Sequence, residues 1–314
     1  MEQALGTSVL TVVGFGDDIS AVRLSKEQVA VLKTDMLVGS TDIPPGMTLK
    51  QAARKALVAN VSDLAVKGVQ PLAGVVALGL PASLSKRDVK DIASGLARTA
   101  RGYGFPLVGG DTNEAKDLTI SIALFALANR RRLVLRSGAR PGNIVAVTGN
   151  FGDTAAGLKA LLEKKMHPSQ LARPLYEAVY NPRAHLELGL KLAASGAITS
   201  SIDSSDGLAW SLHELSRSSR VGIRLDTVPV SKAAMKFADL YGYDEKALAL
   251  YGGEEYHFVV TLRRSRFEAA SRVSNGRLKR IGSVTQEFRG VRLREDGREI
   301  VIARKGWEHF KDHT

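Results

Sequence analysis

Apolar positions recur along the chain with two different periods, and segments of the two kinds alternate. Short apolar runs typical of strands occur at Val29–Leu32, Leu72–Leu80, Leu118–Leu127, Ile144–Thr148, Ile223–Leu225 and Tyr256–Leu262. Segments with helical spacing lie between them, at Thr48–Lys67, Ser85 to about Arg101, Thr154–Lys165, Arg183–Ala194, Leu208–Arg217 and Arg266–Val273. We therefore predict an α/β or α+β fold, with a hairpin near the end of the chain that turns at Glu295–Gly297.

Two of the predicted helices carry recognisable start signals. Thr48 is placed to cap the first helix, whose apolar side carries Leu57 and Leu64. The run Ser85-Lys86-Arg87-Asp88 resembles a capping box, with Asp in the usual Glu or Gln position. These signals fix where the two helices should begin.

The length of the chain suggests two domains. At roughly 150 residues per domain, 314 residues correspond to about two. The segment Arg136–Gly142 is basic and rich in turn-forming residues, which is typical of a connector. We predict domains at residues 1–135 and 136–314.

Composition excludes several kinds of chemistry. The sequence has no Cys, so it forms no disulfide, thiolate nucleophile, iron–sulfur cluster or Cys-ligated zinc site. Met1–Thr7 lacks the pattern of a secretory signal. The longest uncharged run, Gly68–Ser85, is interrupted by Pro and Gly, so it indicates a buried strand with loops and not a membrane span. We expect a soluble, cytoplasmic protein without membrane contact.

The net charge of +12 raises the question of nucleic acid binding. Basic residues cluster at Arg130–Arg132, Arg263–Arg266 and Arg277–Arg280. However, aromatic residues make up only 6% of the chain and no nucleic-acid-binding motif is visible, so a solvated basic face is the favoured interpretation. A non-catalytic nucleic-acid-binding protein stays the alternative from another class, and it predicts strongly salt-dependent binding without nucleotide turnover.

The most informative feature is a set of Asp residues beside Gly, Ser or Thr. These motifs are Gly16-Asp17-Asp18, Thr34-Asp35, Ser62-Asp63, Gly109-Gly110-Asp111-Thr112 and Asp203-Ser204-Ser205-Asp206-Gly207. Any one of them alone is most often a turn or a helix cap. Together, carboxylates and hydroxyls are the hard-oxygen ligands that suit magnesium, and magnesium with few protein ligands usually binds substrate phosphates as well.

The common phosphate-binding and hydrolytic motifs are absent from this sequence. It has no Gly-x-x-x-x-Gly-Lys-Ser/Thr loop, no protein-kinase His-Arg-Asp set, no His-Glu-x-x-His and no Gly-x-Ser-x-Gly. The residues therefore indicate a metal-rich phosphoryl-transfer site outside these groups.

The ordered motifs resemble those of thiamine-monophosphate kinases, from Gly14 to Phe310. They include Gly14-Phe15-Gly16-Asp17-Asp18, Lys33-Thr34-Asp35, Ala59-Asn60-Val61-Ser62-Asp63, Gly109-Gly110-Asp111-Thr112, Arg136–Gly142, Val147-Thr148-Gly149, Asp203–Leu208 and Gly252-Gly253-Glu254-Glu255-Tyr256. The resemblance, especially to archaeal members, implies the two-domain aminoimidazole ribonucleotide synthetase-like fold. In that fold an N-terminal sheet pairs into a barrel across a homodimer, and a C-terminal α+β domain follows.

The resemblance also implies an activity, namely transfer of the γ-phosphoryl group of ATP to thiamine monophosphate, with Mg²⁺ as cofactor. It implies magnesium ligands at Asp18, Thr34, Asp35, Asp63, Asp111, Asp203 and Asp206. It implies nucleotide contacts from Gly110, Asp111, Arg136 and Ser205. No residue is expected to act as a general base, because the acceptor is already a phosphate anion.

Acceptor recognition is where this sequence departs from the family pattern. Trp307 lies in a segment like the family's terminal Gly-aromatic-x-His-Phe motif, whose aromatic residue faces the pyrimidine of the substrate. Asp42 falls near a position where bacterial members often place a substrate-contacting His, and Glu255 replaces Asp in a Gly-Glu-Asp-Tyr motif. We expect these three residues at the acceptor. Lys33 stands where bacterial members often have Ser, so we do not expect its side chain to bind magnesium.

The nearest alternative function is another ATP-dependent synthetase or kinase of the same superfamily, acting on a different small phosphate or carboxylate. Formation of thiamine diphosphate would support the thiamine-monophosphate kinase activity, whereas free phosphate without thiamine diphosphate would support this alternative.

Overall fold

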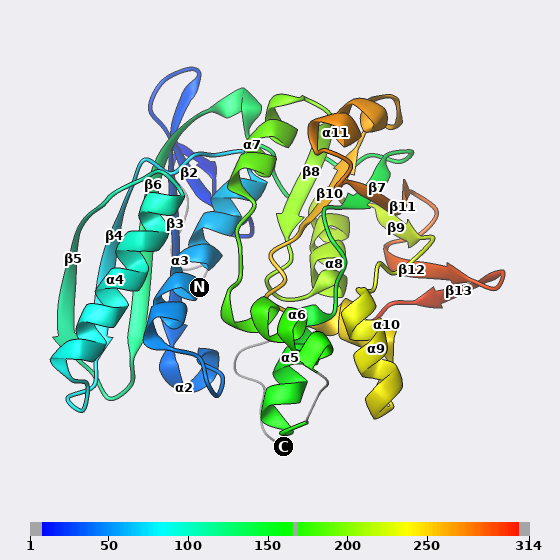
Figure 1. The fold of residues 1–314 in the computed structure, drawn as a ribbon. Coiled ribbons are helices and arrows are strands. Elements are labelled where there is room, and N and C mark those ends of the chain that lie inside the picture. Colours follow the sequence, from blue (N-terminus) through cyan, green and yellow to red (C-terminus); the bar gives the residue numbers. More distant parts are fainter. Residues whose placement is uncertain (1–7, 166–168, 308–314) are drawn as a thin grey trace. The chain divides into compact units, whose positions relative to one another are not determined.

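The computed structural model describes residues 8–165 and 169–307, and these fall into two compact units (Figure 1). Unit 1 ends at Leu133 and also includes Arg183–Ala194. Unit 2 comprises Val134–Pro182 and the chain from Ser195 onward. Arg183–Ala194 lies within the predicted domain 136–314, whereas the structure groups this segment with unit 1.

Unit 1 is a six-stranded sheet with helices. Its elements are β1 (Thr11–Val13), β2 (Ser20–Arg23), β3 (Gln28–Val38), α2 (Gly39–Asp42), α3 (Leu49–Val66), β4 (Ala73–Leu80), α4 (Lys86–Gly102), β5 (Leu107–Glu114), β6 (Thr119–Asn129), the 3₁₀ turn η1 (Arg130–Arg132) and α7 (Leu186–Ala194). The strand order is β1-β2-β3-β6-β4-β5, and every pair is antiparallel except β4–β5.

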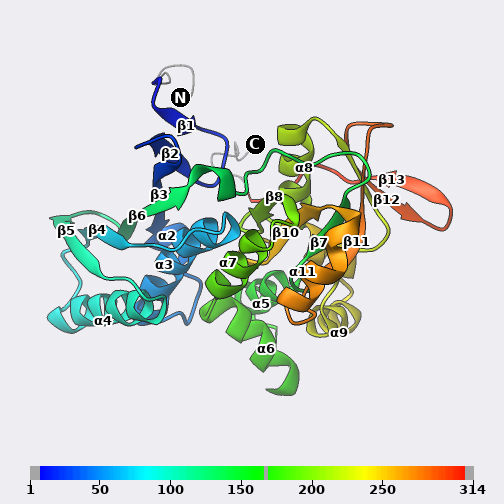
Figure 2. The same ribbon diagram turned by 90° about the horizontal axis from the view of Figure 1, so that it is seen from above.

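Local sequence explains the two long helices of unit 1. Thr48 caps α3 in a capping box with Gln51, and Ser85 caps α4 in a capping box with Asp88, so both predicted starts are confirmed. Figure 2 shows α3 and α4 on one side of the sheet. Strand β6 alternates accordingly, with Ile120, Ile122 and Leu124 buried toward the helices.

Helix α7 joins unit 1 because it packs closely against α3. A Cβ atom added at Gly189 would lie 1.9 Å from the main-chain oxygen of Ala65, and one added at Gly68 would lie 2.1 Å from the Cβ atom of Ala193. Glycine at both positions lets the two backbones approach. The hydroxyl of Tyr103, at the end of α4, also accepts a hydrogen bond from the Ala184 main-chain N–H (2.9 Å).

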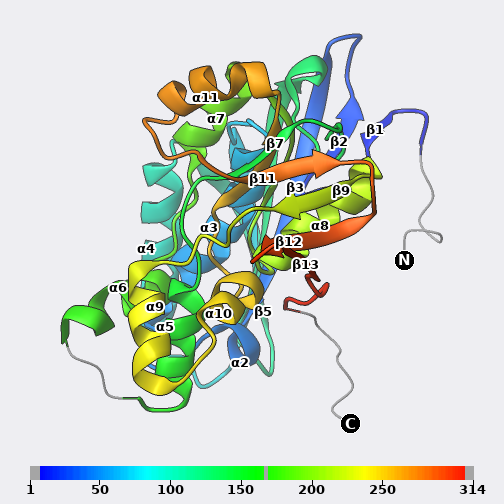
Figure 3. The ribbon, with the colours of Figure 1, turned by 90° about the vertical axis from the view of Figure 1, so that its right-hand side faces the viewer.

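Unit 2 contains a seven-stranded sheet. Its elements are β7 (Ile144–Val147), α5 (Asp153–Leu162), α6 (Ser169–Tyr180), β8 (Ile198–Asp203), α8 (Leu208–Ser219), β9 (Gly222–Leu225), α9 (Lys232–Tyr241), α10 (Glu245–Tyr251), β10 (Phe258–Leu262), the 3₁₀ turn η2 (Arg264–Arg266), α11 (Phe267–Val273), β11 (Lys279–Thr285), β12 (Gly290–Glu295) and β13 (Arg298–Val301). The strand order is β13-β12-β9-β11-β7-β10-β8, and Figure 3 shows β11, β9 and β12 side by side.

The apolar core of unit 2 lies between this sheet and α8, which packs against β8, β9, β10 and β12. Leu208, Leu212 and Leu215 follow helical spacing along α8 and are fully buried. A second apolar cluster joins α5, α6, α9 and α10 around Phe237. The hairpin at Glu295–Gly297 is confirmed, as β12 and β13 pair across it.

The sequence patterns do not predict β1, β2, α2, α6, α9, α10 or β11. The structure gives a mixed α/β fold with two sheets, as predicted in its coarse form. No helix among the described residues is both long and apolar enough to cross a membrane. The cytoplasmic location stays a prediction from the sequence.

Candidate active site

In unit 1, acidic side chains gather where β3 meets α3. Asp35 comes from the middle of β3 and Asp63 from the buried side of α3. The Asn60 side chain accepts a hydrogen bond from the main-chain N–H of Asp35 (2.9 Å), which fixes the strand against the helix. Asp18, in the loop between β1 and β2, has a carboxylate oxygen within 4.8 Å of one from Asp63. The structure thus brings together three of the predicted magnesium ligands.

Lys33 lies among these carboxylates. Its Nζ atom is 2.5 Å from an Asp63 oxygen and 3.1 Å from an Asp35 oxygen. Burial alone would lower the pKa of Lys33, but the charges of Asp63 and Asp35, and hydrogen bonds to both, raise it above its ordinary value. The ammonium group is therefore charged throughout the physiological range.

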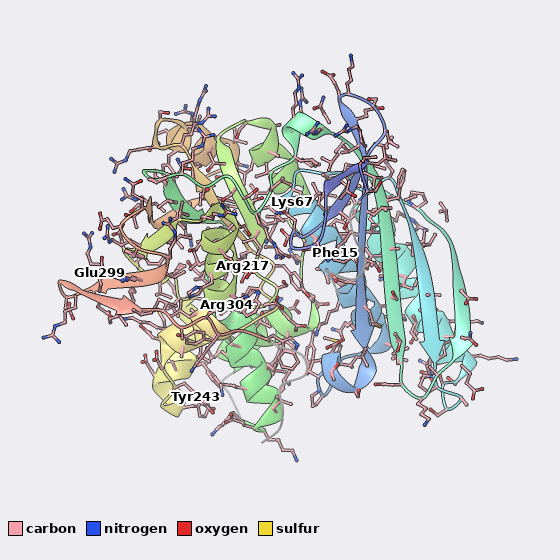
Figure 4. All side chains as sticks on the ribbon, turned by 180° about the vertical axis from the view of Figure 1, so that it is seen from behind. Phe15, Lys67, Arg217, Tyr243, Glu299 and Arg304 are labelled. Atoms are coloured by element: carbon pink, nitrogen blue, oxygen red, sulfur yellow. The ribbon has the colours of Figure 1, made fainter. Side chains whose placement is uncertain are left out.

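Lys67 holds the neighbouring loop in a similar way. It forms the C-cap of α3, is completely buried, and places Nζ 2.8 Å from Asp17 and 2.6 Å from Asp18. Figure 4 labels Lys67 close to the loop that carries Phe15. Neither Lys67 nor Asn60 was predicted as a site residue, although Asn60 lies in the quoted motif Ala59–Asp63. The signal for Lys67 was its position directly after a long apolar helix and directly before Gly68.

Two predicted ligands of unit 1 lie on the other face of its sheet. Side chains alternate along a strand, so Thr34 points away from its neighbours Lys33 and Asp35. Across the sheet, Asp111 of β5 pairs with Ala77 of β4, Ala77 pairs with Ser121 of β6, and Ser121 pairs with Met36 of β3. Met36 lies two residues after Thr34, so Asp111 and Thr34 are on the same face of the sheet. The structure therefore does not bring the Thr34 hydroxyl or the Asp111 carboxylate to the group around Lys33. Gly110 is exposed on the same edge strand, β5.

Asp42 closes the short helix α2. Its carboxylate accepts hydrogen bonds from the Val38 main-chain N–H (2.7 Å) and the Thr41 hydroxyl (3.0 Å). Lys55 donates to its main-chain oxygen (2.7 Å). These contacts give Asp42 a local structural role beside the acceptor contact that we predicted from the sequence.

In unit 2, the segment Asp203–Gly207 runs from β8 to α8. Asp203 is buried, and its main-chain oxygen accepts a hydrogen bond from Ser211 (2.8 Å). The main-chain oxygen of Ser205 accepts from Glu254 N–H (2.6 Å), and that of Asp206 accepts from Trp307 N–H (3.1 Å). The structure therefore brings Trp307 to Asp206, with the Trp307 side chain 53% exposed. Glu308–Phe310, the rest of the terminal motif, lie outside the described residues.

Arg136 belongs to a basic cluster around one buried carboxylate. Glu214 accepts hydrogen bonds from Arg217 (2.7 Å) and Arg304 (3.0 Å) and lies 3.5 Å from Arg136. Burial would raise the pKa of Glu214, but hydrogen bonds and charges from these arginines lower it overall. Figure 4 labels Arg217 and Arg304 close together. Three guanidinium groups around one carboxylate leave excess positive charge, which suits phosphate oxygens.

The predicted connector is anchored to α8 and is not a free linker. The Ser219 hydroxyl accepts hydrogen bonds from the N–H groups of Gly138 (3.2 Å) and Ala139 (3.0 Å). It also donates to the main-chain oxygen of Arg136 (3.4 Å). Arg136 is thereby held beside α8.

Glu255 caps a helix. Its carboxylate accepts hydrogen bonds from the N–H groups of Gly152 (2.7 Å) and Thr154 (3.2 Å) at the start of α5. Burial, with a contribution from the Asp153 charge, raises the pKa of Glu255 to about 8. The contact with the acceptor that we predicted for Glu255 stays a prediction.

The donor set of unit 1 fits magnesium, because buried carboxylate oxygens from separate elements face one another. Asp203 and Asp206 of unit 2 offer the same kind of ligand. Magnesium bound there would neutralise phosphate charge, and the basic cluster around Glu214 could bind further phosphate oxygens.

Comparison with known proteins agrees with this chemistry. Residues 16–128 match the family described as "AIR synthase related protein, N-terminal domain". The chain is also similar to the structure of AaThiL complexed with AMPPCP and TMP, with a TM-score of 0.84, 28% identity, and coverage of 96% of this chain and 93% of that one.

The relatives by sequence are more specific. The thiamine-monophosphate kinase of Nitrosopumilus maritimus is 36% identical over 300 residues, which cover 94% of this chain and 93% of the relative. That of Pyrococcus horikoshii is 34% identical and covers 94% of this chain and 91% of the relative. The chain belongs to the thiamine-monophosphate kinase family.

Proposed function

We propose that the chain transfers the γ-phosphoryl group of ATP to thiamine monophosphate, giving thiamine diphosphate and ADP. The observation that carries this proposal is the carboxylate group formed by Asp18, Asp35 and Asp63 in a member of this family. The similar structure that holds AMPPCP and TMP supports the choice of both substrates.

Magnesium would be held by carboxylates of each unit. In unit 1 we assign Asp18, Asp35 and Asp63, and in unit 2 Asp203 and Asp206. Thr34 and Asp111 remain proposed ligands, but from the opposite face of the unit 1 sheet. Bridging divalent ions supply the positive charge that lets carboxylates and phosphates approach each other.

The remaining residues would position the two substrates. Arg136, Gly110, Asp111 and Ser205 are the proposed nucleotide contacts, and Asp42, Glu255 and Trp307 the proposed acceptor contacts. The acceptor phosphate is itself the nucleophile, so alignment and charge neutralisation supply the catalysis without a protein base.

The open face of the unit 1 sheet supports a homodimer. This face, away from α3 and α4, carries Leu32, Met36, Val75, Phe125 and Leu127, which are 39–61% exposed. Pairing of two such faces around a two-fold axis would bury them and close the two sheets into a barrel. We propose that residues 1–135 bind metal and ATP and form this dimer. Sedimentation showing a stable monomer at micromolar concentration would contradict it.

The decisive experiment is a mass-spectrometric assay of purified protein with ATP, Mg²⁺ and thiamine monophosphate. Thiamine diphosphate should accumulate, and only when Mg²⁺ is present. Free phosphate without thiamine diphosphate would favour another ATP-dependent reaction of the superfamily. Salt-sensitive nucleic acid binding with no nucleotide turnover would favour the non-catalytic alternative.

A further inference from the structure

Lys33 occupies the position of a cation between two proposed magnesium ligands. Its single ammonium nitrogen contacts Asp35 of β3 (3.1 Å) and Asp63 of α3 (2.5 Å). Its side chain is 15% exposed. The two carboxylates come from different elements and are bridged by one positive charge.

An ammonium group can take the position of a metal ion between two carboxylates because of its size and its donors. It is a compact charge with three N–H donors, and carboxylate oxygens satisfy it as they would satisfy a metal ion. A magnesium ion bound to the same two oxygens would sit about 2.0–2.1 Å from each. It would then overlap the nitrogen of Lys33 and be repelled by its charge, so the two cations exclude each other.

The Lys67 site differs from the Lys33 site in its accessibility to solvent. Lys67 also bridges two carboxylates, those of Asp17 and Asp18, but its side chain has no exposed surface. Beside Lys33, by contrast, the Asp35 side chain is 41% exposed. Ions from solution can therefore reach the Lys33 site, and the identity of residue 33 can decide what occupies it.

We propose that Lys33 is a tethered cation that takes the place of one divalent ion between Asp35 and Asp63. The chain then binds one divalent ion fewer than it would with a small neutral residue at position 33. Lys33 acts as a positioning residue, because it fixes the two carboxylates for the ions that the other ligands hold. The inference rests on the proposed magnesium-dependent function.

The test counts bound ions directly. Mn²⁺ is titrated into the full-length chain, with and without a non-hydrolysable ATP analogue, and free Mn²⁺ is measured by electron paramagnetic resonance. The variant Lys33→Ser should bind one more Mn²⁺ per chain than the wild type. Lys33→Arg, which keeps the charge, should match the wild type. Lys50→Ser serves as the control, because Lys50 of α3 forms an exposed ion pair with Asp91 of α4. This variant should also bind as many Mn²⁺ ions as the wild type.

Melting temperature provides a second measurement. Without divalent ions Lys33→Ser should melt several degrees below the wild type, and Mn²⁺ should restore more of its stability than it adds to the wild type. If Lys33→Ser does not fold, Lys33→Gln is titrated instead, because it keeps the length of the side chain without its charge.

Equal Mn²⁺ stoichiometry in the wild type and the neutral variants would overturn the proposal, even if thiamine diphosphate is formed. An extra ion in the neutral variants would support it, even if the wild type forms no thiamine diphosphate. The ion count and the kinase assay can therefore fail independently.

Discussion

The two units accommodate buried carboxylates in different ways. In unit 1, lysine nitrogens lie 2.6 Å from an Asp18 oxygen and 2.5 Å from an Asp63 oxygen. In unit 2, Glu255 faces main-chain N–H groups and the Asp153 carboxylate, and burial raises its pKa to about 8. Buried carboxylates of unit 1 are thus paired with cations, whereas Glu255 of unit 2 is largely neutral at pH 7.

This difference separates ion ligands from structural acids. A carboxylate that is held ionised by a cation can exchange that cation for a metal ion. A carboxylate that takes up a proton and caps a helix has little affinity left for one. By this criterion the carboxylates around Lys33 and Lys67 are the stronger candidates for chemistry, and Glu255 is the stronger candidate for stability.

The largest expected effect is on turnover. Asp35→Asn should lower kcat about a thousandfold or more, because loss of a metal ligand removes several kcal/mol of transition-state stabilisation. Asp111→Asn, on the opposite sheet face, should do the same, because Asp111 is also a proposed magnesium ligand. Steady-state kinetics at saturating Mg²⁺ measure both, with circular dichroism to show that the fold is intact. Normal turnover in either variant would make that Asp a structural residue.

Next in size is the stability of unit 1. Lys67→Met removes a fully buried ammonium from Asp17 and Asp18, which should lower the free energy of unfolding by about 3–5 kcal/mol. Lys50→Met removes an exposed ion pair with Asp91 and should change it by no more than about 1 kcal/mol. Chemical denaturation measures both. Similar small losses would show that the Lys67 charge is not needed to hold the acidic loop.

A smaller effect is expected on acceptor binding in unit 2. Trp307→Ala should raise KM for thiamine monophosphate about tenfold, which corresponds to ~1.4 kcal/mol, and leave KM for ATP nearly unchanged. The physical reason is the broad aromatic face of Trp, which can stack on the flat pyrimidine and attracts the positive charge of the thiazolium ring. Equal weakening for both substrates, or a lower melting temperature with unchanged kinetics, would assign Trp307 to structure.

A last expected effect concerns the pH dependence of stability. The pKa of Glu255 is raised on folding, so its contribution to stability is complete below its unfolded pKa of about 4.5 and is lost as the pH rises through about 8. The melting temperature of the wild type should therefore fall across this range more steeply than that of Glu255→Gln. Glu254→Gln serves as the control. Parallel profiles for wild type and Glu255→Gln would show that Glu255 is ionised in the folded protein.

Local signals predicted the elements well, since the caps at Thr48 and Ser85 depend only on residues a few positions away. Helix α6 escaped prediction because Pro174 lies inside it. Strand β3 was predicted too short. It continues past Leu32 through the charged residues to Val38, and only this full length reveals that Thr34 and Asp35 face opposite sides.

Contacts between residues far apart in the sequence could not be predicted from the sequence alone. Nothing near Lys67 shows that its nitrogen meets the loop at Asp17 and Asp18, fifty residues earlier. The Trp307 N–H likewise meets Asp206 only through the folded arrangement of unit 2. The motifs predict the chemistry of the site, whereas the folded arrangement decides which carboxylates are paired with a cation.

The grouping of α7 with unit 1 has a consequence for synthesis of the protein. The chain leaves unit 1 after Leu133 and returns to it at Arg183, so unit 1 is not a continuous stretch of sequence. As the chain emerges from the ribosome, the side of α3 near Ala65 stays uncovered until about fifty further residues have been made and α7 can pack on it. A fragment ending at Leu133 would leave that surface exposed to solvent. The first half of the protein is therefore completed only after part of the second half has been made.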